Sequence, residues 1–300
     1  MSRFLFAMVM LLLVQLLVLA NSYRQDADAL TKASGQALID TSGYLVEEVL
    51  LEDHRGDKVR LRRAGKGWLL PELDGLPADA ERVDLMLEKL TVTDPGWPVA
   101  QTLAARQRFQ VARYHFRRKL VLSSQQQELG EVYLGTAPVF RKVHARNAAQ
   151  DDIYSVELSL FELPADAGKW LEPRLLQVRA PVAITADGYS LTRTGEKWVL
   201  GSGAEPDPRE LNALLNALRG LRVQGVAEES VAARLPEVEA ELILQVQALA
   251  GDVKLALFEL EGEYYIRSSE YPHLFVISAY EFDKLTGIDG ILMSAPQPPE

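Results

Sequence analysis

The most apolar stretch of the chain lies at its amino terminus. Residues 4–20 read FLFAMVMLLLVQLLVLA, with Gln15 as the one polar residue. A helix rises about 1.5 Å per residue, so this run covers roughly 25 Å of the ~30 Å hydrocarbon core of a bilayer. Arg3 and the α-amino group precede the run, and positive charge stays on the cytoplasmic side. We expect residues 1–20 to form a signal anchor; a cleaved signal peptide is the alternative.

Polar residues dominate the next segment, 21–43, which we interpret as a spacer between the anchor and the folded body. Both interpretations of the amino terminus place the rest of the chain outside the cytoplasm. If the anchor is retained, we expect a single-pass membrane protein with its bulk outside the cytoplasm, which in a bacterium means the inner membrane and the periplasm.

Beyond residue 43 the hydrophobic pattern occurs twice. Residues 59–70 read VRLRRAGKGWLL and residues 189–200 read YSLTRTGEKWVL, with five of twelve positions identical. Alternating apolar and polar residues on either side of Gly65 and Gly195 predict a strand, a turn and a second strand. The shared glycines are expected to supply turn geometry, and the shared Trp68 and Trp198 to cover one face of a sheet.

A helix is predicted after each hairpin. Asp79 and Asp207 suit the N-cap position, where a side-chain oxygen accepts a free backbone N–H. Apolar residues then recur with the i, i+3, i+4, i+7 spacing of one helix face. The two stripes are Val83, Met86, Leu87 and Leu90 in the first copy, and Leu211, Leu214, Leu215 and Leu218 in the second.

The matches continue through later segments, where Arg146 faces Arg267 and Phe161 faces Phe282. The sequence thus predicts an α+β protein: an N-terminal transmembrane helix followed by two copies of a β-rich unit, each with antiparallel strands and one main helix. The expected parts are the anchor 1–20, the spacer 21–43, repeat unit 1 at 44–164, a linker at 165–180, repeat unit 2 at 181–290 and a tail at 291–300.

The amino-acid composition excludes several classes of function. The 42 acidic residues exceed the 32 basic ones, and the net charge of −10 argues against general nucleic-acid binding. Cysteine is absent, which excludes disulfides, thiol nucleophiles and a lipidated cysteine anchor. The four histidines show no helical ligand spacing, and no phosphate-loop, dinucleotide, zinc-protease or serine-hydrolase motif occurs. We expect no cofactor, no metal and no enzymatic activity; a hydrolase with an unrecognised site is the remote alternative.

One stretch of the chain is basic, although the protein as a whole carries a net negative charge. Residues 95–127 contain no Asp or Glu, and basic side chains there are interleaved with Phe109, Tyr114 and Phe116. The basic residues are Arg106, Arg108, Arg113, Arg117, Arg118 and Lys119. Three interpretations remain open: an edge strand whose cations discourage edge pairing, attraction between basic copy one and acidic copy two, or a contact site for an acidic protein or anionic lipid headgroups.

Several of these segments resemble a known family. They are RAGKGWLL at residues 63–70, PAD at 77–79, VYLG at 132–135, Ala145-Arg146, IYSV at 153–156, and Trp170 followed by Leu175-Leu176. Over roughly residues 40–290 the chain resembles the bacterial domain of unknown function 4340. The resemblance implies a membrane-anchored envelope protein, often encoded beside ABC-type transporter components, and carries over no catalytic or ligand residue.

These observations support two functional hypotheses. The first is a non-enzymatic accessory or interaction subunit of an ABC-type transporter system or another envelope assembly. The second is an extracytoplasmic binding module for a small molecule, lipid or glycan, with its site in a cleft between the two copies, where Arg146 and Arg267 would lie.

Overall fold

The computed structural model describes residues 15, 37–41, 43–91, 95–125, 127–288 and 290–293. The predicted anchor, residues 1–20, lies outside this part of the chain apart from Gln15. Among the described residues, no helix combines the length and the apolar character needed to cross a bilayer.

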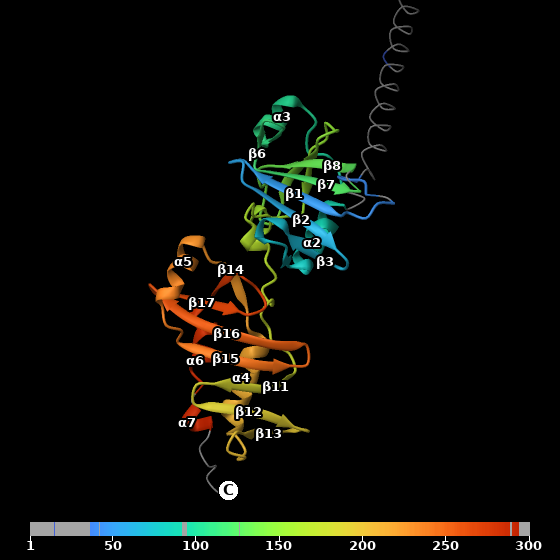
Figure 1. Cartoon of the computed structure of the whole chain (residues 1–300). Helices are drawn as coiled ribbons and strands as arrows, with labels where there is room; N and C mark the ends of the chain where they lie inside the picture. The colour runs from blue at the N-terminus through green and yellow to red at the C-terminus, as the bar shows by residue number, and fades with distance from the viewer. Residues whose placement is uncertain are drawn as a thin grey trace, which may run out of the picture. The chain divides into compact units, whose positions relative to one another are not determined.

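The described chain is a mixed α+β structure with antiparallel sheets, as predicted. It forms two compact units, unit 1 ending at Ala167 and unit 2 beginning at Gly168 (Figure 1). Each unit is built on its own eight-stranded sheet.

In the sheet of unit 1 the strands lie side by side in the order β10-β9-β8-β7-β1-β2-β3-β4. The strands of unit 1 are β1 (Glu48–Asp53), β2 (Lys58–Ala64), β3 (Gly67–Leu70), β4 (Leu76–Ala78), β7 (Arg118–Ser124), β8 (Gln127–Leu134), β9 (Val143–Asn147) and β10 (Tyr154–Val156), with a separate hairpin of β5 (Val111–Ala112) and β6 (His115–Phe116). The helices are α2 (Ala80–Leu90), α3 (Leu103–Arg108) and the short 3-10 helices η1 (Pro71–Leu73) and η2 (Leu160–Glu162).

Helix α2 packs on one face of this sheet, here called the inner face. The Asp79 side chain accepts the backbone N–H of Arg82, which confirms the predicted N-cap. The predicted stripe of α2 is buried in full: Val83, Met86, Leu87 and Leu90. Trp68 of β3 lies under the helix, and its indole N–H donates to the Asp84 carboxylate at 3.0 Å.

The last residues of the predicted spacer also pack onto unit 1. Leu38 and Ile39 are buried, and the Asn147 side-chain amide donates to the carbonyl oxygen of Leu38 at 2.7 Å. This segment therefore ties the chain to the body before the first strand begins.

In the sheet of unit 2 the strands lie side by side in the order β13-β12-β11-β15-β16-β17-β18-β14. Its strands are β11 (Pro181–Ala186), β12 (Tyr189–Thr194), β13 (Lys197–Leu200), β14 (Val223–Val226), β15 (Leu242–Ala248), β16 (Gly251–Leu260), β17 (Glu263–Ser268) and β18 (Leu274–Ile277). Its helices are α4 (Pro208–Gly220), α5 (Glu229–Arg234), α6 (Ala279–Thr286), α7 (Gly290–Met293) and the 3-10 helices η3 (Ala167–Trp170) and η4 (Leu235–Glu237).

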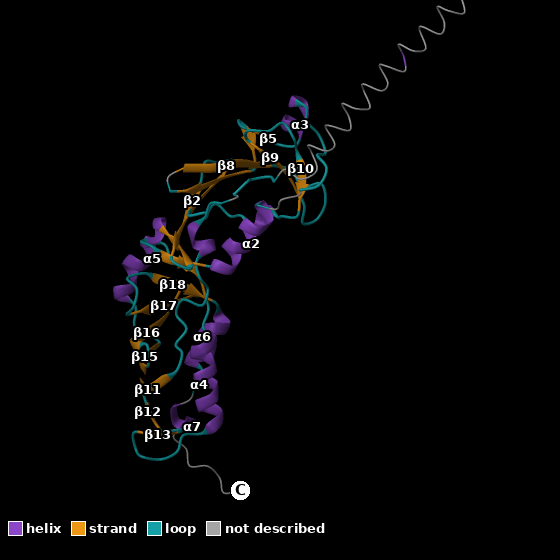
Figure 2. Cartoon of the chain, turned by 90° about the vertical axis from the view of Figure 1, so that its right-hand side faces the viewer, coloured by secondary structure: helices purple, strands orange, loops and turns teal. Residues whose placement is uncertain are grey.

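Helices α4 and α6 cover the inner face of this second sheet, and Figure 2 shows them on one side of its strands. The Asp207 side chain accepts the backbone N–H groups of Arg209 and Glu210, so the second predicted N-cap is also confirmed. Leu214 and Leu218 of the predicted stripe are fully buried, while Leu211 and Leu215 are half-buried.

Residues 168–180, assigned to a linker from the sequence, lie against unit 2. Leu171, Leu176 and Val178 are buried, and the Val178 N–H donates to the Leu218 carbonyl oxygen at 3.1 Å. The Val223 N–H donates to the Pro173 carbonyl oxygen at 2.8 Å.

Seven strands follow one another in the same order in both sheets: β1, β2, β3, β7, β8, β9 and β10 in unit 1, and β11, β12, β13, β15, β16, β17 and β18 in unit 2. Shared order and cross-strand register define equivalent positions. By that register Val49 is equivalent to Ile184, and Ala145 to Ile266.

On the outer face of each sheet, a separate segment packs over one end. In unit 1 the segment with α3, β5 and β6 packs over Tyr133 and Ile153. In unit 2 the segment with α5 and η4 packs over Phe258, Tyr265 and Leu274. These two outer segments differ in structure, and the candidate sites lie beside them.

Candidate functional site

The basic stretch divides between a central strand and an outer lobe. Arg118 and Lys119 belong to β7, which pairs with β1 on one side and β8 on the other. The interpretation as an edge strand is therefore wrong for these two residues. It failed because β1, the partner that covers β7, lies far away in the sequence.

Both cations of β7 have acidic partners on β1. The Lys119 ammonium lies 2.7 Å from the Glu52 carboxylate, and the Arg118 guanidinium lies 3.9 Å from the Asp53 carboxylate. Burial opposes ionisation of Asp53, but backbone N–H donors at Arg55 and Asp57 together with Arg118 hold its pKa below the usual range. These charges stabilise the sheet internally.

Ion pairs continue across the outer face of this sheet. Glu48 pairs with Arg60 at 3.6 Å and with Arg62 at 3.5 Å, while Glu52 also pairs with Lys58 at 3.7 Å. The outer face of β1, β2 and β7 thus carries a network of ion pairs between neighbouring strands.

The remaining basic residues lie in what we call the basic lobe, residues 101–117, which contains α3, β5 and β6. Thr102 caps α3 by accepting the Ala105 N–H, and the helix ends against Phe109. Arg108, Arg113 and Arg117 are exposed, and none of them forms an ion pair with a described carboxylate. Tyr114, at the tip of the hairpin, is 72% exposed.

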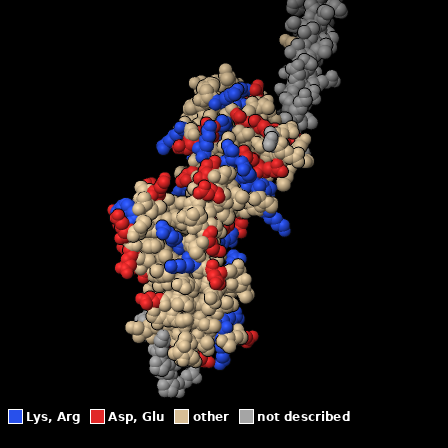
Figure 3. Space-filling view, in the orientation of Figure 1, with Lys and Arg blue, Asp and Glu red and all other residues tan. Residues whose placement is uncertain are grey.

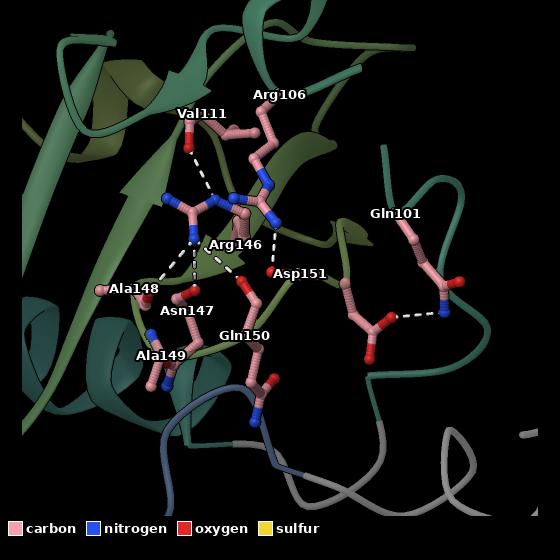
Figure 4. Close-up of polar contacts among 10 residues, drawn as sticks. Gln101, Arg106, Val111, Arg146, Asn147, Ala148, Ala149, Gln150 and Asp151 are labelled. Carbon is pink, nitrogen blue, oxygen red and sulfur yellow. Dashed lines mark hydrogen bonds and ion pairs between the residues drawn. The ribbon is translucent and has the colours of Figure 1, made fainter. Parts of the chain in front are cut away.

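Arg146 of β9 supports the lobe from beneath. Its side chain is only 4% exposed, and its guanidinium donates to four backbone carbonyl oxygens, as Figure 4 shows. The acceptors are Val111 at 2.9 Å, Asn147 at 2.9 Å, Ala148 at 3.3 Å and Gln150 at 2.9 Å. The guanidinium also lies 5.0 Å from the centre of the Tyr133 ring. Arg146 is a structural support and does not line a surface cleft.

The charges around Arg146 follow from this burial. Burial is the main cause that lowers the Arg146 pKa, and the neighbouring Arg106 adds to the effect. Arg106 itself pairs with Asp151, and Gln101 donates to Asp152 at 2.6 Å. Both contacts hold the lobe to the 148–152 turn that also receives the Arg146 guanidinium.

His144, also on β9, is a second support that sequence reasoning missed. Its ring stacks on Phe109 with centroids 4.0 Å apart, and its Nδ1 lies 2.8 Å from the Thr136 carbonyl oxygen. Burial lowers the pKa of His144, and the nearby Arg108 lowers it further. The ring is therefore best accommodated as the neutral imidazole. Nothing in its local sequence marks it, because the stacking partner is 35 residues away.

Arg267 occupies the equivalent place in unit 2 but is exposed. Its neighbour across the strands is Ala256, where Arg146 faces Tyr133. Arg267 lines a groove that lies entirely within unit 2. The cleft predicted from the sequence lay between the two copies, so this groove of η4 and the outer sheet face is a different feature, and the earlier cleft stays a prediction.

In the described part of the chain, no group of three or more His, Asp or Glu side chains converges.

Comparison with models of protein families gave a match. No curated protein and no solved structure matched the chain. A family model described as Domain of unknown function (DUF4340) matches residues 68–238, from β3 of unit 1 to the end of η4 in unit 2. This span contains the basic lobe and both of its supports, and it exceeds half of the 300 residues. The chain therefore belongs to the DUF4340 family.

Proposed function

We propose that the protein is a non-enzymatic interaction protein of the bacterial envelope, held at the inner membrane by residues 1–20. We propose further that it serves as an accessory subunit of an ABC-type transporter system, and that its body consists of two copies of one β-rich unit. The observation that carries the interaction role is the basic lobe of unit 1.

The lobe has the properties of a presented binding surface. Arg108, Arg113 and Arg117 are exposed and lack carboxylate partners among the described residues, in contrast to the paired Arg118 and Lys119. Exposed apolar surface accompanies these cations, since Leu103 is 68% and Tyr114 72% exposed. Arginine and tyrosine are the residues that most often dominate binding energy at protein interfaces.

The lobe is also held rigidly, which limits the entropy lost when a partner binds. Arg146 bonds its base at Val111, and the Thr136 N–H donates to the Phe109 carbonyl oxygen at 2.8 Å. The equivalent segment of unit 2 has α5 and η4 in place of the β5–β6 hairpin. The fold therefore does not require the hairpin, and its exposed charges favour a partner with an acidic surface.

Crosslinking of the full-length protein in its native membrane tests this proposal. The variant Arg108→Gln, Arg113→Gln and Arg117→Gln removes the exposed cations and is expected to lose most crosslinks to envelope proteins. A matched variant, Arg193→Gln, Arg209→Gln and Arg219→Gln, removes exposed cations of unit 2 and should keep them. Equal crosslinking by both variants, or a loss confined to binding of anionic lipid vesicles, would contradict the proposal.

A further inference from the structure

The outer faces of the two sheets differ in charge at equivalent positions. In unit 1 the central positions are Leu50, Arg60, Arg62, Val121 and Glu131, and in unit 2 they are Thr185, Ser190, Thr192, Gln245 and Lys254. Ser190 and Thr192 thus stand where Arg60 and Arg62 form ion pairs in unit 1, and Lys254 stands in place of Glu131. Figure 3 shows this face of unit 2, with few charges over β11, β12 and β15.

A groove of about 410 Å³ lies at one end of this face, next to η4. Its apolar lining comes from η4 and the segment after it, and from β15 and β16: Leu235, Pro236, Val238, Ala240, Ile243, Ala256 and Phe258. Ala256 takes the place of Tyr133, and Ile243 that of Lys119. The smaller side chain at 256 leaves space that a tyrosine ring fills in unit 1.

Two cations border this apolar groove. Lys254 of β16 and Arg267 of β17 both line it, and neither forms an ion pair within the described chain. Arg267 lies opposite Ala256, which makes it the diagonal neighbour of Lys254 on the same face of the sheet. Residues in such diagonal positions lie about 7–8 Å apart. Ser269 lies opposite Lys254, and its hydroxyl accepts the Lys254 backbone N–H at 2.9 Å.

A polar hollow of about 580 Å³ continues from the groove across β16, β15, β11 and β12. Thr185, Thr192 and Gln245 line it, and it shares Lys254 and Ser269 with the groove. Along one face the surface therefore changes from apolar to cationic to uncharged and hydrogen-bonding, with Asp252 as the one carboxylate in the hollow.

We infer that this face of unit 2 binds an anionic amphiphile, an alkyl chain that ends in a phosphate and a hydroxyl-rich head. The alkyl chain lies in the groove under η4, where burial of apolar surface favours it. The phosphate lies between Lys254 and Arg267, whose unpaired cations donate charge-assisted hydrogen bonds. The head lies over the hydroxyl and amide side chains of the hollow.

Unit 1 provides an internal comparison for this site. There the Tyr133 side chain occupies the space that corresponds to the groove. The Arg146 guanidinium donates its hydrogen bonds to backbone carbonyl oxygens of its own unit. The same arginine position thus supports a lobe in unit 1 and remains available to a ligand in unit 2. The inference goes beyond the proposed interaction role and does not depend on it.

Photolabelling of the full-length protein in amphipol tests the site. The probe is dodecyl phosphate with a diazirine on its terminal carbon, used below its micelle concentration and followed by peptide mapping. We expect labels on the peptides around residues 235–243 and 254–258, with decanol diazirine, which lacks the phosphate, labelling them weakly. Inorganic phosphate alone should not compete, because it lacks the chain.

Two variants act on different parts of the site. Ala256→Tyr introduces the side chain of unit 1 and fills the groove, while Lys254→Gln with Arg267→Gln removes the cations and leaves the groove open. Either variant should reduce labelling of these peptides by about tenfold or more, equivalent to about 1.4 kcal/mol of binding energy. The matched control Arg193→Gln should label as the wild type does. Undiminished labelling in both variants, or labelling confined to residues 1–20, would overturn the inference.

Discussion

Arg146 and Arg267 show how one residue type takes two roles at equivalent places in two sheets. The guanidinium of Arg146 is enclosed by the basic lobe and satisfies four carbonyl oxygens, whereas Arg267 is exposed beside a groove. The difference arises from neighbours: Tyr133 and the lobe cover the first arginine, and Ala256 leaves the second one open. The same residue type at equivalent positions of two sheets therefore does not establish a shared role.

Removal of Arg146 should be costly. Arg146→Ala leaves buried carbonyl oxygens without donors and opens a cavity, so we expect a loss of about 2–4 kcal/mol in the free energy of unfolding. Arg267→Ala is the matched control and should change it by less than about 0.5 kcal/mol, since an exposed side chain without partners is removed. Urea unfolding followed by circular dichroism measures both. Similar effects of the two substitutions would contradict the assigned role of Arg146.

The role of a single residue could be predicted from the sequence wherever the group that it contacts lies a few positions away along the chain. Asp79 and Asp207 cap helices as predicted because an N-cap bonds within three residues. The burial of Arg146 and His144 could not be predicted, since the side chains and carbonyls that enclose them come from α3, β5 and distant turns.

At the scale of elements, the two units differ most in the connections around the outer face. The sheet register makes Leu134 equivalent to Leu257, since these residues face Ala145 and Ile266. Between Leu134 and Ala145 the chain of unit 1 has two residues more than unit 2 has between Leu257 and Ile266. The difference of two residues comes from the connection between β8 and β9, a long loop in unit 1, where β16 and β17 are joined by the turn Glu261-Gly262.

That loop contacts the basic lobe at Gly135. A Cβ atom at this position would lie 1.9 Å from the Phe109 carbonyl oxygen and 2.6 Å from that of Gln110. Only glycine allows the backbone of α3 and the β8–β9 loop to approach this closely. The contact fixes the lobe to the sheet, beside the bonds of Arg146.

Gly135→Ala should therefore displace the lobe. We expect a loss of about 2 kcal/mol in the free energy of unfolding, because the backbone must shift to admit the methyl group. Hydrogen exchange of residues 103–117 should accelerate at the same time. Gly67→Ala is the control, since its nearest atom would be 3.9 Å away and its backbone conformation is ordinary. Unchanged exchange in the lobe of Gly135→Ala would contradict the assigned contact.

The hairpins and main helices were predictable from hydrophobic periodicity, but the strand order was not. A periodic run indicates which face of a strand is buried and does not say which strand lies beside it. For this reason the basic residues of β7 were open to interpretation as an edge, although β1 pairs with them throughout.

At the scale of the whole molecule, each unit has a core of its own. Leu61 and Leu191 occupy equivalent places in β2 and β12, and both are fully buried. Because each unit is compact by itself, we expect a substitution in the core of one to leave the stability of the other unchanged.

Thermal unfolding of the full-length protein should show two transitions. Leu61→Ala should lower the midpoint of one and Leu191→Ala that of the other, since each leaves a cavity that costs about 2–5 kcal/mol. Differential scanning calorimetry with the single and double variants measures the assignment. A single transition lowered by either substitution would show that the units unfold together.

The central position of β1 and β11 also determines how the chain acquires its structure. The hairpin side of each sheet, such as β2 with β3, and the meander from β7 to β10 join strands that follow one another along the chain. The pair β1 and β7 instead joins residues about seventy positions apart, so its formation must wait until the entropy of closing that long loop is overcome. We therefore expect the pair β1 and β7, and the equivalent pair β11 and β15, to form late in the folding of each sheet.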